Sequence, residues 1–307
     1  MKLLLSYPAS IARSLSLTAL HQSQKLRTVL ALCLALTFFL TTLAPAVSAQ
    51  DASTLPPKVE NEHFVIYKAV DGDTICREAN LLQKRALDQI VPKNLRQINH
   101  TGDNAVEMLS ANALPQHLTI ILRASAHLDA APDAKAAFLR AAAAWENVVS
   151  SPITIYLDAD FGLDNFGTAW ESGVLGSTSS PSLSNVNYTV LRNNLIANAN
   201  TTAKVSIYNA LPNNSLPTDL GNATTVSVSS SIARAIGMLD PTAQPGDNAP
   251  RIGFNSAFSY DFDRSNGISS GQTDFEAVAI HEIGHALGFS SRSGSGSQTP
   301  AVWDLYR

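Results

Sequence analysis

Residues 274–289, DFEAVAIHEIGHALGF, form the segment around which this 307-residue chain is organised. His281, Glu282 and His285 make an H-E-x-x-H arrangement inside an apolar run. Two histidines four residues apart on a helix lie on one face, about one turn from each other. Both rings can then reach a single ion at the Zn–N distance of about 2.0–2.1 Å. The pattern therefore predicts a helix that binds Zn²⁺ through His281 and His285.

Glu282 is predicted to be the catalytic base and not a ligand. It can accept a proton from a water that the metal has activated and pass that proton to a leaving amine. Bound zinc lowers the pKa of such a water to about 7, so the reaction can run at neutral pH. The alternative is a chance motif on a core helix, which would bury His and Glu side chains without partners at a cost in free energy.

Helix signals flank the motif on both sides. Thr273 and Glu276 have the spacing of a capping box, and the mostly apolar residues between them and Phe289 predict a buried helix. Gly288 is expected directly after the helix, with Phe289 packing back on the last turn. Gly284 is expected to leave room beside the metal for substrate or backbone.

Composition and charge limit the classes of partner. The chain has the composition of a globular protein and a formal net charge of −4. No cluster of basic residues is present, so nucleic acid is not an expected partner. The sequence gives no indication of an oligomeric state.

Residues 1–49 resemble an export signal. Basic residues precede an apolar run over residues 28–43, and the small residues 46–49 (AVSA) suit cleavage before Gln50. The apolar run is short for a membrane span and ends near Pro45, which favours cleavage over an uncleaved anchor. The expected protein is secreted and has no stable membrane association, with membrane anchoring as the alternative.

The remaining pattern predicts an α+β fold with a mixed sheet, because strands and helices alternate. Residues 50–113 are expected to form an N-terminal region, either a pro-segment or a subdomain, and residues 114–307 the main domain. The Gly- and Ser-rich residues 173–180 are expected to be a loop or an edge strand. The strands are predicted over residues 62–70, 117–124, 152–160, 224–228 and 251–258, and the longer helices over 79–90, 133–149 and 188–199.

Cys33 lies in the expected signal, so the mature chain would keep only Cys76 and no intrachain disulfide. Two interpretations of Cys76 stay open. Its thiolate can occupy the open position of the zinc and keep the protein latent. Alternatively, it is a small buried residue or forms an intermolecular link.

Residues 278–289, VAIHEIGHALGF, resemble zincin metallopeptidases and especially the metzincin-like branch. With residues 136–162 and 253–267 and the later WDLYR, the likeness extends over residues 114–307 to predicted secreted bacterial metalloproteases. It implies a zincin-like mixed sheet above a cleft whose floor is the H-E-x-x-H helix. It also implies His281 and His285 as zinc ligands, Glu282 as catalytic base and a protein or peptide substrate.

The third ligand departs from that family. Metzincins continue as H-E-x-x-H-x-x-G-x-x-H, or with Asp in the last place; here Gly288 matches, but Ser291 stands where the ligand would be. Asp304 can return to the metal across the flexible residues 294–297. Otherwise the ligand lies beyond Arg307 or the site is incomplete, and the C-terminal subdomain is expected to be truncated.

These patterns predict a secreted zinc-dependent endopeptidase. The alternatives are a non-catalytic surface or binding protein with a zincin fold, and a metal-dependent hydrolase of a non-peptide or cell-wall amide bond. An extended peptide substrate is expected to pair with an exposed edge strand, for which residues 173–177 are a candidate.

Overall fold

The computed structural model describes residues 58–69, 72–98, 116–244, 248–297 and 299–306. All of them belong to one compact unit, Ala52–Arg307. The expected signal, residues 1–49, and residues 99–113 of the N-terminal region lie outside the described residues.

A mixed sheet forms the centre of this unit, which confirms the predicted α+β class. Its strands follow the order β2-β1-β8-β12-β5-β4-β3, and β11 pairs with a further part of β8. β4, β5 and β12 run parallel to one another, while β1, β2, β3, β8 and β11 pair antiparallel with their neighbours. The bounds are β1 (Lys58–Lys68), β2 (Thr74–Glu78), β3 (Arg96–Ile98), β4 (Thr119–Ala124), β5 (Thr154–Gly162), β8 (Val174–Asn187), β11 (Thr225–Ser229) and β12 (Arg251–Asn255).

Three two-stranded sheets accompany the main one. They join β6 (Asp164–Asn165) to β7 (Thr168–Ala169), β9 (Leu216–Thr218) to β10 (Gly221–Ala223) and β13 (Tyr260–Asp261) to β14 (Thr273–Asp274).

β8 lies inside the sheet, so the prediction of a loop or edge strand over residues 173–180 is wrong. It is 14 residues long and pairs with β12 on one side and with β1 on the other. Its glycine, Gly176, is required by packing. A Cβ at Gly176 would lie 2.8 Å from the ring of Phe254 and 2.9 Å from the carbonyl oxygen of Gly253. Gly176 thus reflects the close approach of β12 and not solvent exposure.

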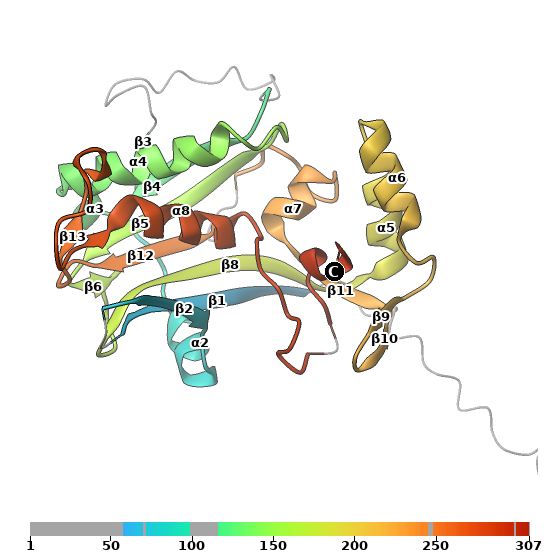
Figure 1. Cartoon of the computed structure of the whole chain (residues 1–307), viewed down its shortest axis with the longest axis horizontal. Helices are drawn as coiled ribbons and strands as arrows, with labels where there is room; N and C mark the ends of the chain where they lie inside the picture. Colours follow the sequence, from blue (N-terminus) through green and yellow to red (C-terminus); the bar gives the residue numbers. More distant parts are fainter. Residues whose placement is uncertain (1–57, 70–71, 99–115, 245–247, 298, 307) are drawn as a thin grey trace, which may run out of the picture. The chain divides into compact units, whose positions relative to one another are not determined.

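Helices cover both faces of the sheet. α8 runs beside α4 on one face, whereas α2 packs against β1 on the opposite side (Figure 1). The helices are α2 (Leu81–Asp88), α3 (Ala126–Asp129), α4 (Pro132–Glu146), α5 (Tyr188–Ala197), α6 (Thr202–Ala210), α7 (Ser230–Ala235) and α8 (Phe275–Ala286), with 3-10 turns η2 (Arg264–Asn266) and η3 (Val302–Tyr306). Among the helices of the described chain, none has the length and hydrophobicity needed to cross a bilayer.

Three buried aromatic rings fix α8 against the sheet. Phe275 of α8 lies 4.9 Å from Phe254 of β12 and 5.9 Å from Phe138 of α4, between ring centroids. Phe138 and Phe254 are 5.7 Å apart, and the exposed fraction of all three side chains is zero. Tilted and edge-to-face pairs of this kind each add about 0.5–1.5 kcal/mol beyond burial of their area. The start of α8 is therefore held in a fixed position against β12.

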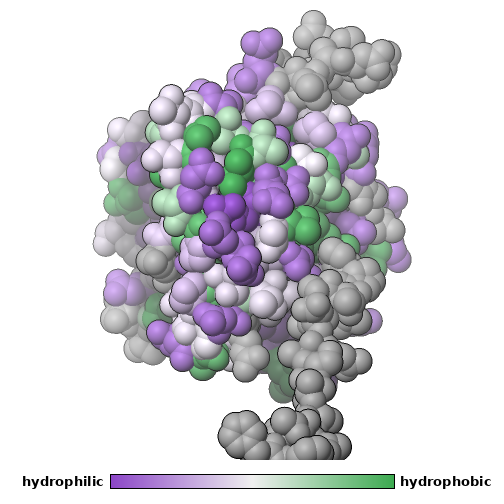
Figure 2. Space-filling view, turned by 90° about the vertical axis from the view of Figure 1, so that its right-hand side faces the viewer, coloured by the Kyte–Doolittle hydropathy of each residue, from purple (hydrophilic) through white to green (hydrophobic). Residues whose placement is uncertain are grey.

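A second apolar cluster lies around β11, α5, α7 and η3. η3 joins it through Val302 and Leu305, and Ala301 forms a bridge to Ser227 of β11. α6 has no buried residue. It lies at the right of Figure 1, on the side that faces the viewer in Figure 2. Hydrophilic side chains occupy the centre of that side, and hydrophobic ones form separate small areas (Figure 2).

Candidate metal centre

The start of α8 is set by Asp274, whose carboxylate accepts a hydrogen bond of 2.9 Å from the backbone N–H of Ala277. The predicted capping box beginning at Thr273 is therefore wrong by one residue. Thr273 is held in β14, where it pairs with Tyr260, so it cannot also serve as the N-cap.

The end of α8 has the predicted form. Gly288 has a φ of 94° and donates from its N–H to the carbonyl of His285, while the N–H of Phe289 reaches the carbonyl of Gly284. This pair of bonds satisfies the last carbonyls of the helix. A Cβ at Gly284 would lie 3.1 Å from the Trp145 ring, so this glycine makes room for the Trp145 side chain, whereas room for substrate or backbone was predicted.

The imidazole rings of His281 and His285 converge. Their Nε2 atoms are 3.1 Å apart, and Nδ1 of His285 lies 3.0 Å from the carbonyl oxygen of Phe289. Because a carbonyl only accepts, Nδ1 carries the proton and Nε2 keeps its lone pair. Phe64 of β1 stacks on the His285 ring at 3.9 Å with an interplanar angle of 5°, which fixes the plane of that ring.

Both histidines are suited to bind a metal ion. Burial lowers the pKa of His281, and burial together with the charge of His281 lowers the pKa of His285 to about 4. Both rings are then neutral at pH 7, as ligation requires. Their 3.1 Å separation is shorter than about 4 Å, twice the Zn–N bond length, so one ion can contact both nitrogens.

Glu282 is completely buried beside the two rings. Its Oε2 accepts a hydrogen bond of 2.6 Å from Thr178 of β8. Its Oε1 is 3.8 Å from Nε2 of His281 and has no hydrogen-bond partner among the described residues. Burial raises the pKa of Glu282 to about 7, against the opposing effects of the Thr178 and Cys76 side chains. One carboxylate oxygen is therefore anchored, and the other is available for chemistry at near-neutral pH.

Cys76 is the fourth member of this group. The ligand atoms of Cys76, His281, Glu282 and His285 all lie within 4.8 Å of one another. Sγ of Cys76 is 3.5 Å from Nε2 of His285. Burial, followed by the charge of Glu282, raises the pKa of the Cys76 thiol. The sequence around Cys76 left its role open, and the structure places it beside the predicted ligands.

Asp304 is held elsewhere in the structure. Its carboxylate accepts hydrogen bonds from the hydroxyl of Ser291 and from the backbone N–H groups of Arg292 and Ala301, at 2.6–2.9 Å. It is not in the group that contains His281 and His285. In this arrangement Asp304 closes the turn before η3, and Ser291 assists it.

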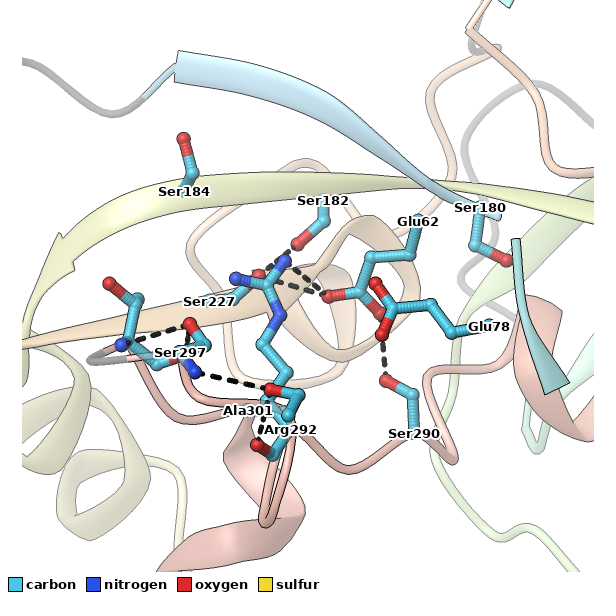
Figure 3. Close-up of polar contacts among 12 residues, drawn as sticks. Glu62, Glu78, Ser180, Ser182, Ser184, Ser227, Ser290, Arg292, Ser297 and Ala301 are labelled. Carbon is cyan, nitrogen blue, oxygen red and sulfur yellow. Dashed lines mark hydrogen bonds and ion pairs between the residues drawn. The ribbon is translucent and has the colours of Figure 1, made fainter. Parts of the chain in front are cut away.

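The segment after α8 is tied to β1 by a polar network (Figure 3). Glu62 of β1 accepts hydrogen bonds from Arg292 at 2.9 Å, Ser290 at 2.8 Å and Ser227 at 3.1 Å. Ser180 of β8 donates to the carbonyl of His285 at 3.0 Å. These contacts hold the end of α8 and the segment that follows it in the chain against β1 and β8.

Thr178, Phe64 and Ser180 were not expected from the sequence to be parts of the site. Thr178 and Ser180 lie two residues apart on one strand, so both can face α8. Their alternation in the Ser-rich stretch was the only available signal, and the same stretch was predicted to be a loop or an edge.

A second set of potential metal ligands, His127, Asp160 and Asp164, lies at the end of β5. Its buried member is already satisfied by the protein: Asp160 accepts from the Ser125 hydroxyl and from the backbone N–H of Phe166. This set therefore shows no unpaired buried atom comparable with Oε1 of Glu282.

Comparisons of the chain with protein-family models, with curated proteins and with solved structures found no match.

Proposed function

We propose that this chain is an exported zinc-dependent endopeptidase of zincin type. The observation that supports this most directly is the placement of Glu282. A fully buried carboxylate has one oxygen anchored by Thr178 and the other unpartnered beside two converging imidazoles. Such an atom is costly to bury unless a ligand or cation compensates it.

His281 and His285 would hold the zinc ion, because both rings are neutral and one ion can contact both Nε2 atoms. When bound, zinc would supply a Lewis acid that polarises a substrate carbonyl and acidifies water. In the same site Oε1 of Glu282 would accept the proton of the attacking water as its oxygen bonds to the carbonyl carbon. Glu282 would then return that proton to the amide nitrogen as the C–N bond breaks.

A pKa of about 7 suits Glu282 to both halves of this proton transfer. Its fixed Oε2 leaves Oε1 pointed at one position, which reduces the reorganisation needed for reaction. The proposed role thus uses both the burial of this side chain and its single hydrogen bond.

Within residues 173–177, which were predicted to pair with substrate, Gly176 and Ser177 lie between β1 and β12 and so offer no free strand edge. The His281 side chain is 54% exposed, whereas Glu282 is inaccessible. A peptide would therefore approach from the side of His281.

The decisive experiment compares the zinc-loaded protein with Glu282→Gln on a peptide library. Glu282→Gln should retain zinc and lose hydrolysis by at least about 100-fold, the usual scale of general acid–base catalysis. Glu276→Gln, on the same helix but paired with Arg140, is the matched control and should remain active. Full activity of Glu282→Gln would contradict the mechanism.

The same assay separates the alternative functions. A protein that binds zinc but cleaves neither peptides nor peptidoglycan amides would be a binding protein with this fold. Cleavage of peptidoglycan fragments alone would indicate a cell-wall amidase. Export would be tested by sequencing the N-terminus of protein recovered outside the cell, which should begin at Gln50.

A further inference from the structure

We propose that Cys76 is the third protein ligand of the ion held by His281 and His285. This inference rests on the proposed zinc site and names the residue that completes it. It also makes the N-terminal strands β1 and β2 part of the metal centre.

Strand register brings Cys76 to the site. Cys76 is paired with Ile66 across β1 and β2, so both side chains project from the same face of the sheet. Ile66 is 1% exposed and belongs to the core cluster that contains the apolar residues of α8, and Cys76 packs against that cluster. Phe64, two residues before Ile66, faces the same way and stacks on His285.

The distance between Cys76 and His285 fits one shared ion. Sγ of Cys76 is 3.5 Å from Nε2 of His285, within the reach of about 4.3 Å given by a Zn–S and a Zn–N bond. A second observation that points to a cation is Oε1 of Glu282, which is buried, has no hydrogen-bond partner among the described residues and belongs to this group. A thiolate with two imidazoles is a ligand set that zinc favours.

Apart from Glu282, whose Oε1 has the proposed role in proton transfer, no rival ligand lies nearby in the described part of the chain. Asp304 accepts three hydrogen bonds around its own turn, and Ser291 donates to it. The group otherwise contains only Glu282, whose Oε2 is held by Thr178. Cys76 with the two histidines gives three protein ligands and leaves the fourth tetrahedral position for water or substrate, the arrangement typical of catalytic zinc.

β1 is an integral strand of the sheet and not a removable inhibitory segment. It pairs with β8 from Lys58 opposite Ser184 to Tyr67 opposite Val174. Glu62 of β1 binds Arg292 and Ser290 behind α8, and Lys68 donates to the Thr273 hydroxyl at 2.9 Å. These contacts favour a permanent ligand over a removable inhibitor.

The test uses the full chain with Cys33→Ser, so that Cys76 is its only thiol. Loaded with Co²⁺, this protein should show thiolate-to-metal charge-transfer absorption, and adding Cys76→Ser should abolish that absorption. The Cys76→Ser change should also weaken zinc binding by more than about 100-fold, beyond the usual effect of changing an outer-shell partner. Bound zinc should protect Cys76 from a thiol reagent, a measurement that needs no change at Cys76.

The outcomes separate this inference from the function on which it rests. Bound Co²⁺ without charge-transfer absorption, or no protection by zinc, would overturn the role of Cys76 and leave the His281–His285 site standing. Failure to bind either metal would overturn both proposals. Higher peptidase activity of Cys76→Ser would show that the thiolate blocks the ion, and would overturn its role as the third ligand.

Discussion

Thr178 of β8 donates a 2.6 Å hydrogen bond to Oε2 of Glu282, which lies 104 residues later in α8. This contact joins the sheet to the candidate catalytic carboxylate and leaves the other oxygen, Oε1, without a partner among the described residues. Sheet and helix therefore act together to orient one side chain.

Thr178→Val should raise the pKa of Glu282 further, because the hydrogen bond favours the charged carboxylate. A hydrogen bond to a charged group contributes about 1.5–3 kcal/mol, which corresponds to about 1–2 pKa units. The acidic limb of the kcat/KM profile should move to higher pH by that amount. Ser184→Ala, on the same strand but bonded to the Lys58 carbonyl, should leave the profile unchanged.

Glu282→Gln should stabilise the metal-free chain at pH 8. The folded pKa of about 7 lies above the ordinary value of 4.5, so the folded state binds the proton more tightly. The contribution of Glu282 to the free energy of unfolding is fully present below pH 4.5. It falls by about 3 kcal/mol as the pH rises through about 7. Urea unfolding should show this gain for Glu282→Gln at pH 8 and almost none at pH 4. A gain independent of pH would contradict the assignment.

Gly288→Ala should destabilise the fold by at least about 3 kcal/mol, because a Cβ would add a clash to the strain of a positive φ. That Cβ would lie 2.1 Å from Oγ of Ser229 and 2.9 Å from Cδ1 of Ile232. Gly294 also has a positive φ but nothing within 4 Å of the added Cβ, so Gly294→Ala should cost only about 1–2 kcal/mol. Denaturant midpoints of the two variants would measure the difference, and equal losses would show that packing at Gly288 is unimportant.

Glu62→Ala should cost about 2–4 kcal/mol, because it leaves Arg292 without its carboxylate and the Ser290 hydroxyl without an acceptor, while Ser227 keeps only its bond with Ser182. Glu60→Ala removes an exposed ion pair with Lys58 on the same strand and should change stability by less than about 0.5 kcal/mol. Thermal unfolding of both variants tests this contrast. Similar melting temperatures would mean that the network behind α8 adds little.

Local signals were sufficient for some elements. The apolar run, Gly288 and Phe289 determine α8 and its C-terminal end within a few residues, and the expected strands near Ile155 and Ile252 are present. Short-range hydrogen bonds and side-chain periodicity account for these features, so sequence alone can reveal them.

Long-range packing determined what the sequence did not show. β8 resembles a loop locally, yet Gly176 is required by the close ring of Phe254. Asp304 is near the expected spacing for a ligand, but the backbone N–H groups of Arg292 and Ala301 compete for its carboxylate. Cys76 meets His285 across 209 residues of sequence, and no local pattern specifies that meeting.

That separation sets the order of events during synthesis. Contacts between residues far apart in sequence form late, because closure of a long loop must precede them. Cys76 is synthesised long before α8. A nascent chain that has not yet reached His285 therefore cannot contain the assembled metal centre. The proposed hydrolytic capacity consequently requires synthesis of the chain through His285.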